Sequence, residues 1–241
     1  MLTCLKSMAR KMKRLTNKQK IRDNREQNLL IDRIVSVYGQ KIAREIRVTM
    51  RKAAQYYNGQ QVDINGLYEN HKNKLTDILL GMVQKTAGEF TERTAQQVKK
   101  SHPIFERKRL MVAPINEIQA PIIAETIATQ YLQAQMLEKI TQITETTRTS
   151  IGQIVEAGIN QGLSERQVAK LIYDVAPSKS ASRAQTIART ETHGAANAAA
   201  QATAQASGVE MAREWVSGSD ERVRPDHLNA NGQTVSMYQP F

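Results

Sequence analysis

Residues 31–46 read IDRIVSVYGQKIAREI and decide how the first part of the chain folds. Apolar residues recur in this stretch at steps of three and four, which places them on one face of an α-helix. The face consists of Ile31, Ile34, Val35, Tyr38, Ile42 and Ile46. Followed in both directions, the pattern predicts a helix from about Lys18 to Tyr57, where Asn58-Gly59 stops it.

A second long helix is predicted from about Leu67 to Val98. Its apolar stripe comprises Leu67, His71, Leu75, Ile78, Leu79, Met82, Val83 and Phe90. Gly81 and Gly88 weaken this helix locally, each by about 1 kcal/mol relative to alanine. Because only a short link separates the two helices, we expect them to form an antiparallel hairpin.

Prolines interrupt the helical pattern after the hairpin. His102-Pro103 is followed by Pro114 and Pro121, and proline is excluded from a regular helix interior. The sequence therefore predicts a linker here and a third helical region at about 122–159. Ser164 to Gln167 fit a capping box that begins a short helix, which we expect to end at Pro177.

The C-terminal part reads as a small α+β unit. A polar turn is predicted at 178–182, and Ser182 can cap the next helix, at about 183–207. This helix is rich in alanine, and we expect a neighbouring element to bury its small face. Gly208 ends it. Alternation at Met211, Arg213 and Trp215 predicts a strand, and Asn231-Gly232 predicts a turn before a return strand at Thr234-Val235.

The predicted fold class is therefore mainly α, with long helices and a small C-terminal α+β unit made of the alanine-rich helix and a short β-hairpin. The predicted division is a basic flexible arm (1–20), a helical hairpin (21–101), a linker (102–121), a helical region (122–177) and the α+β unit (178–241).

Charge is concentrated at the N-terminus. The chain has a formal net charge of +11, and residues 1–25 hold nine Lys or Arg against one acid. Such an arm is typical of a contact with a phosphate backbone or an acidic surface, although a solvated tail that aids solubility has the same composition. The predicted DNA-binding residues are Lys6, Arg10, Lys11, Lys13, Arg14, Lys18 and Lys20.

The single cysteine, Cys4, excludes an intramolecular disulfide and a Cys-x-x-Cys metal site. The four histidines share no ligand spacing on one face, so we expect no metal and no cofactor. His71 is expected to be a core-edge histidine with one hydrogen bond. The sequence contains neither a signal peptide nor an apolar run of the length that crosses a bilayer, so no membrane contact is expected.

The order of motifs in the last sixty residues resembles the head-morphogenesis domain of tailed bacteriophages, the Mu F-like minor head proteins. The motifs begin with Ala188-Arg189-Thr190-Glu191 at the start of a helix that Gly208 bounds. A tryptophan on a short strand, a D-x-R-x-R-x-x-H run and a glycine follow, here Trp215, Asp220, Arg222, Arg224, His227 and Gly232.

The resemblance implies a structural minor head protein that is not an enzyme. Its implied place is the virion, inside the capsid near the portal vertex, and the host cytoplasm during assembly, with a prophage as one source of the gene. Its implied partners are the portal protein, scaffold or major capsid protein, and double-stranded DNA bound without sequence preference. Members of the family often finish near a Cys-Arg-Cys, whereas this chain stops at Phe241 without it. We therefore expect a short member, a fragment or part of a longer protein.

The polar cluster Asp220, Arg222, Arg224 and His227 also permits an enzymatic interpretation, in which arginines stabilise an anionic transition state and the histidine moves a proton. A nuclease or other phosphotransfer enzyme is thus the alternative function, and a plain nucleic-acid-binding protein is a third. We prefer a structural role, because carboxylate–arginine pairs and a histidine hydrogen bond also lock a turn. In that interpretation the helix carrying Arg189 and Glu191 packs on the loop through buried ion pairs, for example Arg189 with Asp220. Trp215 is then expected to fill a core.

Overall fold

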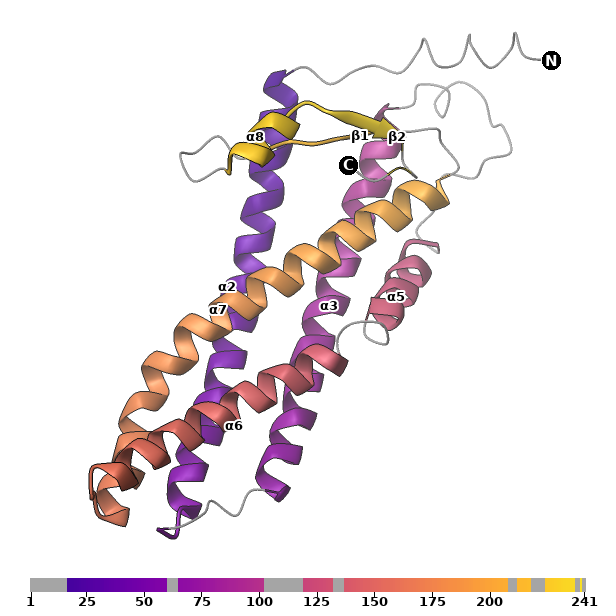
Figure 1. Ribbon diagram of the computed structural model, residues 1–241. Helices are drawn as coiled ribbons and strands as arrows, with labels where there is room; N and C mark the ends of the chain where they lie inside the picture. The colour runs from indigo at the N-terminus through magenta and orange to yellow at the C-terminus, as the bar shows by residue number, and fades with distance from the viewer. Residues whose placement is uncertain are drawn as a thin grey trace, which may run out of the picture.

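The computed structural model describes residues 17–59, 65–101, 119–131, 137–207, 212–217, 224–236 and 239. The elements in chain order are α2 (Asn17–Tyr56), α3 (Asn65–Ser101), α5 (Gln119–Tyr131), α6 (Leu137–Asn160), α7 (Glu165–Ala206), β1 (Ala212–Glu214), α8 (Pro225–Ala230) and β2 (Thr234–Ser236). Long helices form a bundle, and a small unit with a two-stranded sheet follows α7 (Figure 1), so the predicted fold class is confirmed. Among these described helices, none combines the length and apolar character needed to cross a membrane.

The first two helices form the predicted antiparallel hairpin (Figure 1). Of the stripe predicted for α2, every residue except Tyr38 is buried, and Tyr38 is half-buried. The Tyr38 hydroxyl donates a hydrogen bond of 2.9 Å to the backbone oxygen of Gly81, which ties α2 to the middle of α3. On α3 the stripe is buried at His71, Leu75, Leu79, Met82, Val83 and Phe90.

Both ends of α7 lie close to predicted helix ends, at Ser164 and at about 207, but the predicted break inside it was wrong. Ser164 caps the helix as expected, because its hydroxyl accepts from the Gln167 amide and the Gln167 side chain accepts from the Ser164 backbone. The helix does not stop at Pro177. It continues to Ala206, so the predicted turn at 178–182 and the cap at Ser182 are wrong, and the predicted boundary at 177/178 lies inside a helix.

Burial on both sides of Pro177 explains why the helix continues. An interior proline costs about 3 kcal/mol, since it removes one hydrogen bond and clashes with the preceding turn. Burying one large aliphatic side chain contributes about 1.5–3 kcal/mol, so a few such side chains outweigh the proline. On α7 the buried residues before and after Pro177 include Val168, Ile172, Ala184 and Ala188. The hydroxyls of Ser178 and Ser180 also donate to backbone oxygens within this turn.

Small residues bring α7 close to α2, and this is the most extensive contact between any two elements. Gly39 of α2 is buried, and a Cβ atom at this position would lie 3.7 Å from the Cβ of Ala188 and 3.9 Å from the backbone oxygen of Ala184. The expected burial of the small face is confirmed on the alanine-rich half as well, where Ala195, Ala196, Ala199 and Ala204 are buried.

We expect that Ala199→Leu lowers the free energy of unfolding by about 1–3 kcal/mol, because the added atoms overpack a closed contact. Ala199 is fully buried, whereas Ala181 lies on the exposed side of the same helix. Ala181→Leu is the matched control and is expected to change stability by less than about 0.5 kcal/mol. Denaturant titrations of both variants measure the difference. Equal midpoints for the two variants would contradict the packing of the small face.

Two predicted boundaries shift in the structure. Lys18 and Lys20 lie in the first turns of α2 and not in a flexible arm, whereas the other predicted DNA-binding residues, between 1 and 16, are outside the described residues. Residues 119–121 belong to α5 and not to the linker, since Pro121 occupies the first turn of a helix, where proline is tolerated. The rest of the predicted linker, 102–118, lies outside the described residues, as does Gly208.

Candidate functional site

The Arg189-Thr190-Glu191 motif lies in the middle of α7 and divides between two environments. Successive helical residues are about 100° apart, so the side chains point in different directions. Arg189 and Thr190 are exposed, whereas Glu191 is buried. Arg189 pairs with Asp32 of α2 at 3.4 Å, and Glu191 pairs with Lys139 of α6 at 3.0 Å.

These pairs show the described partners of the motif. The ion pair of Arg189 joins α7 to α2, and both side chains of this pair are more than half exposed. The expected pair of Arg189 with Asp220 stays a prediction. Asp220 and Arg222 lie outside the described residues. Within the part of the chain that the structure describes, β1, β2 and α8 make no extensive contact with α7. The other helices of the bundle pack against α7 instead. Residue spacing within one helix does not predict contacts between separate helices.

His193 lies one turn beyond Arg189 on α7 and is half-buried. Burial lowers the pKa of His193, and the nearby positive charge of Arg189 lowers this pKa further, while Asp32 acts in the opposite direction. The neutral imidazole is therefore the favoured form beside the Arg189–Asp32 pair.

The C-terminal unit is built on a short antiparallel ladder. Arg213 of β1 lies opposite Val235 of β2, which confirms the expected strand and its return strand. The strands are not joined by a tight hairpin, because α8 lies between them in sequence. The expected turn at Asn231-Gly232 follows α8, with Gly232 at φ 83°. Gly232 then donates to the Trp215 backbone oxygen at 2.9 Å and so extends the ladder.

The predicted D-x-R-x-R-x-x-H loop therefore ends in a helix. Pro225 occupies its first position after Arg224 as N-cap, an arrangement that suits the fixed φ of proline. The side-chain oxygen of Asn231 accepts a hydrogen bond of 3.1 Å from the Ser217 amide, which joins the residues after β1 to the turn after α8. The Asn231 side chain thus has a second role, besides the turn, that sequence spacing did not reveal.

Trp215 and His227 are brought together from opposite ends of this segment. Their ring centroids are 5.4 Å apart with an interplanar angle of 62°, an edge-to-face arrangement that aromatic rings prefer. Trp215 is half-buried and His227 is exposed, so the expectation that the tryptophan fills a core is wrong.

The remaining described members of the polar cluster are on the surface. Arg224, the N-cap of α8, and Asp226 and His227 within it are all exposed. Over the described ranges, no group of three or more His, Cys, Asp or Glu side chains lies together in a way that could hold a metal ion. The described residues of the cluster therefore lie along an exposed surface.

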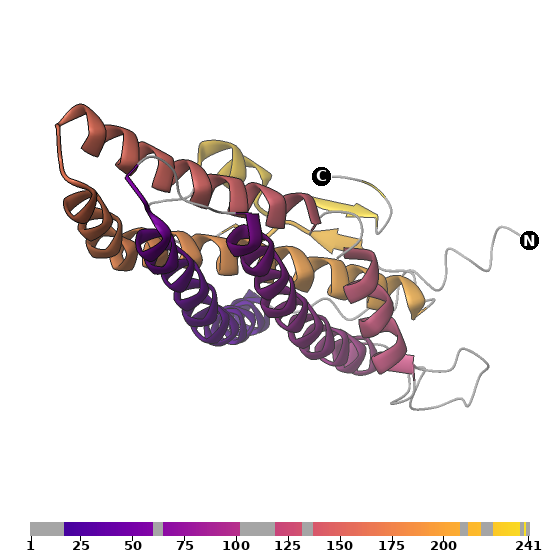
Figure 2. The ribbon, with the colours of Figure 1, turned by 90° about the horizontal axis from the view of Figure 1, so that it is seen from below.

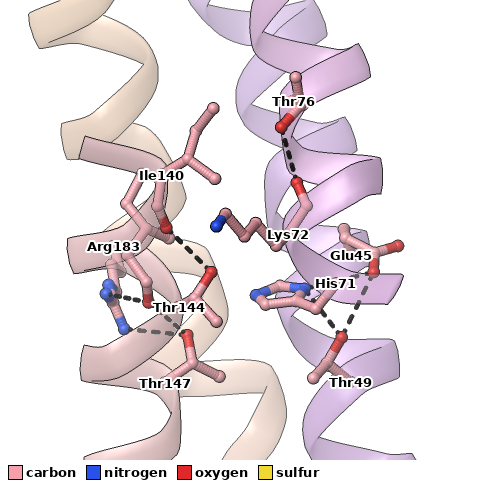
Figure 3. Close-up of polar contacts among 10 residues, drawn as sticks. Glu45, Thr49, His71, Lys72, Thr76, Ile140, Thr144, Thr147 and Arg183 are labelled. Carbon is pink, nitrogen blue, oxygen red and sulfur yellow. Dashed lines mark hydrogen bonds and ion pairs between the residues drawn. The ribbon is translucent and has the colours of Figure 1, made fainter. Parts of the chain in front are cut away.

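Buried polar contacts instead occur where the long helices meet (Figure 3). His71 of α3 is 1% exposed, and its Nδ1 lies 2.9 Å from the Thr49 hydroxyl and 3.3 Å from the Glu45 carboxylate, both of α2. The expected core histidine is thus confirmed, with two polar neighbours on α2. Across α6 and α7, the Arg183 guanidinium donates to the backbone oxygen of Ile143 at 2.8 Å and to Thr147 at 3.3 Å. Burial lowers the pKa of Arg183.

We expect that His227→Ala lowers the free energy of unfolding by about 1 kcal/mol, the usual contribution of one aromatic pair. The variant should also change the fluorescence of Trp215, the single tryptophan, because it removes the ring at its edge. Asp226→Ala, an exposed neighbour on the same helix, is the matched control. Unchanged emission in His227→Ala would contradict the ring contact.

Comparison with known proteins agrees with the motif order. Residues 149–241 match the family described as Phage Mu protein F like protein. The matched range covers the end of α6, all of α7 and the C-terminal unit, and the resemblance to Mu F-like head morphogenesis proteins is confirmed over this range. No curated protein matches the chain, and no solved structure matches it. This family resemblance indicates a role in phage head morphogenesis.

Proposed function

We propose that the protein is a structural minor head protein that binds at the portal vertex of a tailed-phage capsid and assists head assembly. The match of residues 149–241 to the Mu F-like family carries this proposal. The described structure supports it in two ways. The bundle offers long helical faces for protein contact, and the polar residues of α8 are arranged along an exposed surface instead of around a reaction site.

The proposed partners are the portal protein and, during assembly, scaffold or major capsid protein. The proposed location is the capsid interior near the portal, after assembly in the host cytoplasm. Co-expression with the portal protein of the same phage and gel filtration of the complex test this contact. The proposal expects the chain to elute with the portal ring. Separate elution over a range of salt concentrations would overturn the portal contact.

We also propose that the basic arm contacts packaged DNA without sequence preference. Each phosphate contact contributes about −0.9 to the slope of log affinity against log salt concentration. Neutralising five arm residues is therefore expected to flatten this slope and to weaken binding to duplexes of any sequence. The variant replaces Lys6, Arg10, Lys11, Lys13 and Arg14 with glutamine.

Titration of a labelled duplex at several salt concentrations measures both quantities. Equal slopes for the arm variant and the unaltered chain would remove the arm from DNA binding. The same preparations, incubated with DNA and magnesium or manganese, are expected to leave the DNA intact. Metal-dependent cleavage that is lost in a folded His227→Ala variant would favour the nuclease alternative.

A further inference from the structure

The outward face of α2 carries a row of arginines that continues from the basic arm. Arg22, Arg33 and Arg44 are spaced eleven residues apart, which is close to three helical turns, so they lie nearly in line along the helix. Arg25 lies at the edge of the same row. We call Arg22, Arg25, Arg33 and Arg44 the arginine face of α2; all four side chains are exposed.

This face points away from the core. The buried residues Ile31, Val35, Ile42 and Ile46 lie on the opposite side of the helix. The contact with α7 is on a flank, where Gly39 meets Ala188. Seen along the bundle, α2 has α3 and α7 on its inner side (Figure 2). The arginine face is therefore open to a partner that approaches from outside.

The charges on this face are poorly compensated. In α2 as a whole, ten Lys or Arg stand against four Asp or Glu. Arg22 shares Glu26 with Arg93 of α3, through exposed contacts of 3.4 Å and 3.1 Å. Within the described ranges, no carboxylate lies within ion-pair distance of Arg25, Arg33 or Arg44. Glu26 lies on this face beside Arg22, but beyond it Arg33 and Arg44 carry the same sign.

The type of side chain and the length of the row along the helix favour phosphate as the occupant. Arginine presents a planar fork of donors that matches phosphate, whereas lysine acts as a point charge. From Arg22 to Arg44 the helix rises about 33 Å at 1.5 Å per residue, which is about one turn of duplex DNA. A duplex lying along α2 therefore presents each of its two phosphate backbones to the row about once, with a groove between them.

We propose that the arginine face of α2 is a rigid binding surface for the phosphate backbone of duplex nucleic acid, separate from the arm. This inference rests on the DNA contact in the proposed function and adds a second, helical site to it. In this proposal the face fixes the direction of the duplex along the bundle.

The test compares two triple variants of the full chain with equal change in net charge. The face variant is Arg25→Gln, Arg33→Gln and Arg44→Gln. The control variant is Lys74→Gln, Arg166→Gln and Lys179→Gln, three exposed residues of α3 and α7. All six positions are on the surface, so both variants are expected to retain the melting temperature of the unaltered chain.

The face variant is expected to flatten the log–log salt slope for duplex DNA by up to about 2.7, from three phosphate contacts at 0.9 each. The control variant is expected to keep the slope. Equal slopes for the two variants would overturn the arginine face, while the arm variant still reports on the proposed function. Binding to polyglutamate is measured with the same variants. If the face variant loses as much affinity for polyglutamate as for DNA, the occupant is an acidic protein surface and not nucleic acid.

Discussion

Replacing Pro177 with alanine is expected to raise the free energy of unfolding by about 2 kcal/mol, although Pro177 is an exposed residue. An interior proline costs about 3 kcal/mol, because it has no amide hydrogen for the preceding turn and its ring crowds that turn. Alanine restores the bond to the Tyr173 carbonyl. It also gives the unfolded chain more freedom, which offsets up to about 1 kcal/mol of the gain. Reversible denaturant unfolding measures the net effect.

Pro121→Ala is the matched control for this variant. Pro121 is the third residue of α5, where the first-turn amides have no intrahelical partner, so its missing hydrogen is not needed. We expect a change of less than about 0.5 kcal/mol at Pro121. A loss of stability in Pro177→Ala would show that the proline is required for the path of α7 and is not merely tolerated.

Pro177 also shows where reasoning from sequence succeeded and where it failed. The periodic stripes of α2 and α3 were sufficient to predict both helices, because each stripe is itself the buried face. The capping box at Ser164 was equally direct, since all of its bonds lie within four residues. The break at Pro177 was predicted wrongly, because the local effect of a proline does not reveal the burial on either side of it.

Long-range partners were not accessible in the same way. Arg189 forms an ion pair with Asp32, which lies far away in the sequence, and Glu191 forms one with Lys139 of the preceding helix. No spacing rule links such pairs. The helix α8 was missed for a different reason. It has six residues, and a segment that short has too few positions to show a period.

The Glu191–Lys139 pair is expected to be the most sensitive polar contact of the Arg189-Thr190-Glu191 motif. The Glu191 side chain is 6% exposed and the Lys139 side chain 33% exposed, with 3.0 Å between the charged atoms. Removing one partner of a buried pair costs about 3–5 kcal/mol, because the other charge stays in a poorly solvated place. We expect Lys139→Met to fall near the lower limit, at about 3 kcal/mol, since methionine keeps the apolar stem and the site is partly open to water.

Arg189→Met is the matched control, since it removes the cation from the other ion pair of the motif. Both side chains of the Arg189–Asp32 pair are more than half exposed. Exposed pairs contribute about 0–1 kcal/mol, so this variant is expected to unfold at nearly the same denaturant concentration as the unaltered chain. Equal losses for Lys139→Met and Arg189→Met would contradict the distinction between a buried and an exposed pair.

A double-mutant cycle separates the charge interaction from packing at Glu191. Glu191→Gln keeps the shape and an acceptor oxygen for Lys139, so it is expected to cost only about 1 kcal/mol. In the Lys139→Met/Glu191→Gln variant no charge remains at the contact, and the combined loss is expected to be smaller than the sum of the single losses by at least about 1 kcal/mol. Additive losses would mean that Glu191 is held by its other neighbours and that α6 is not anchored to α7 through this carboxylate. A coupled result would explain why the motif places its acid one turn before the alanine-rich contact. There the carboxylate fixes α6 against the helix that also packs on α2.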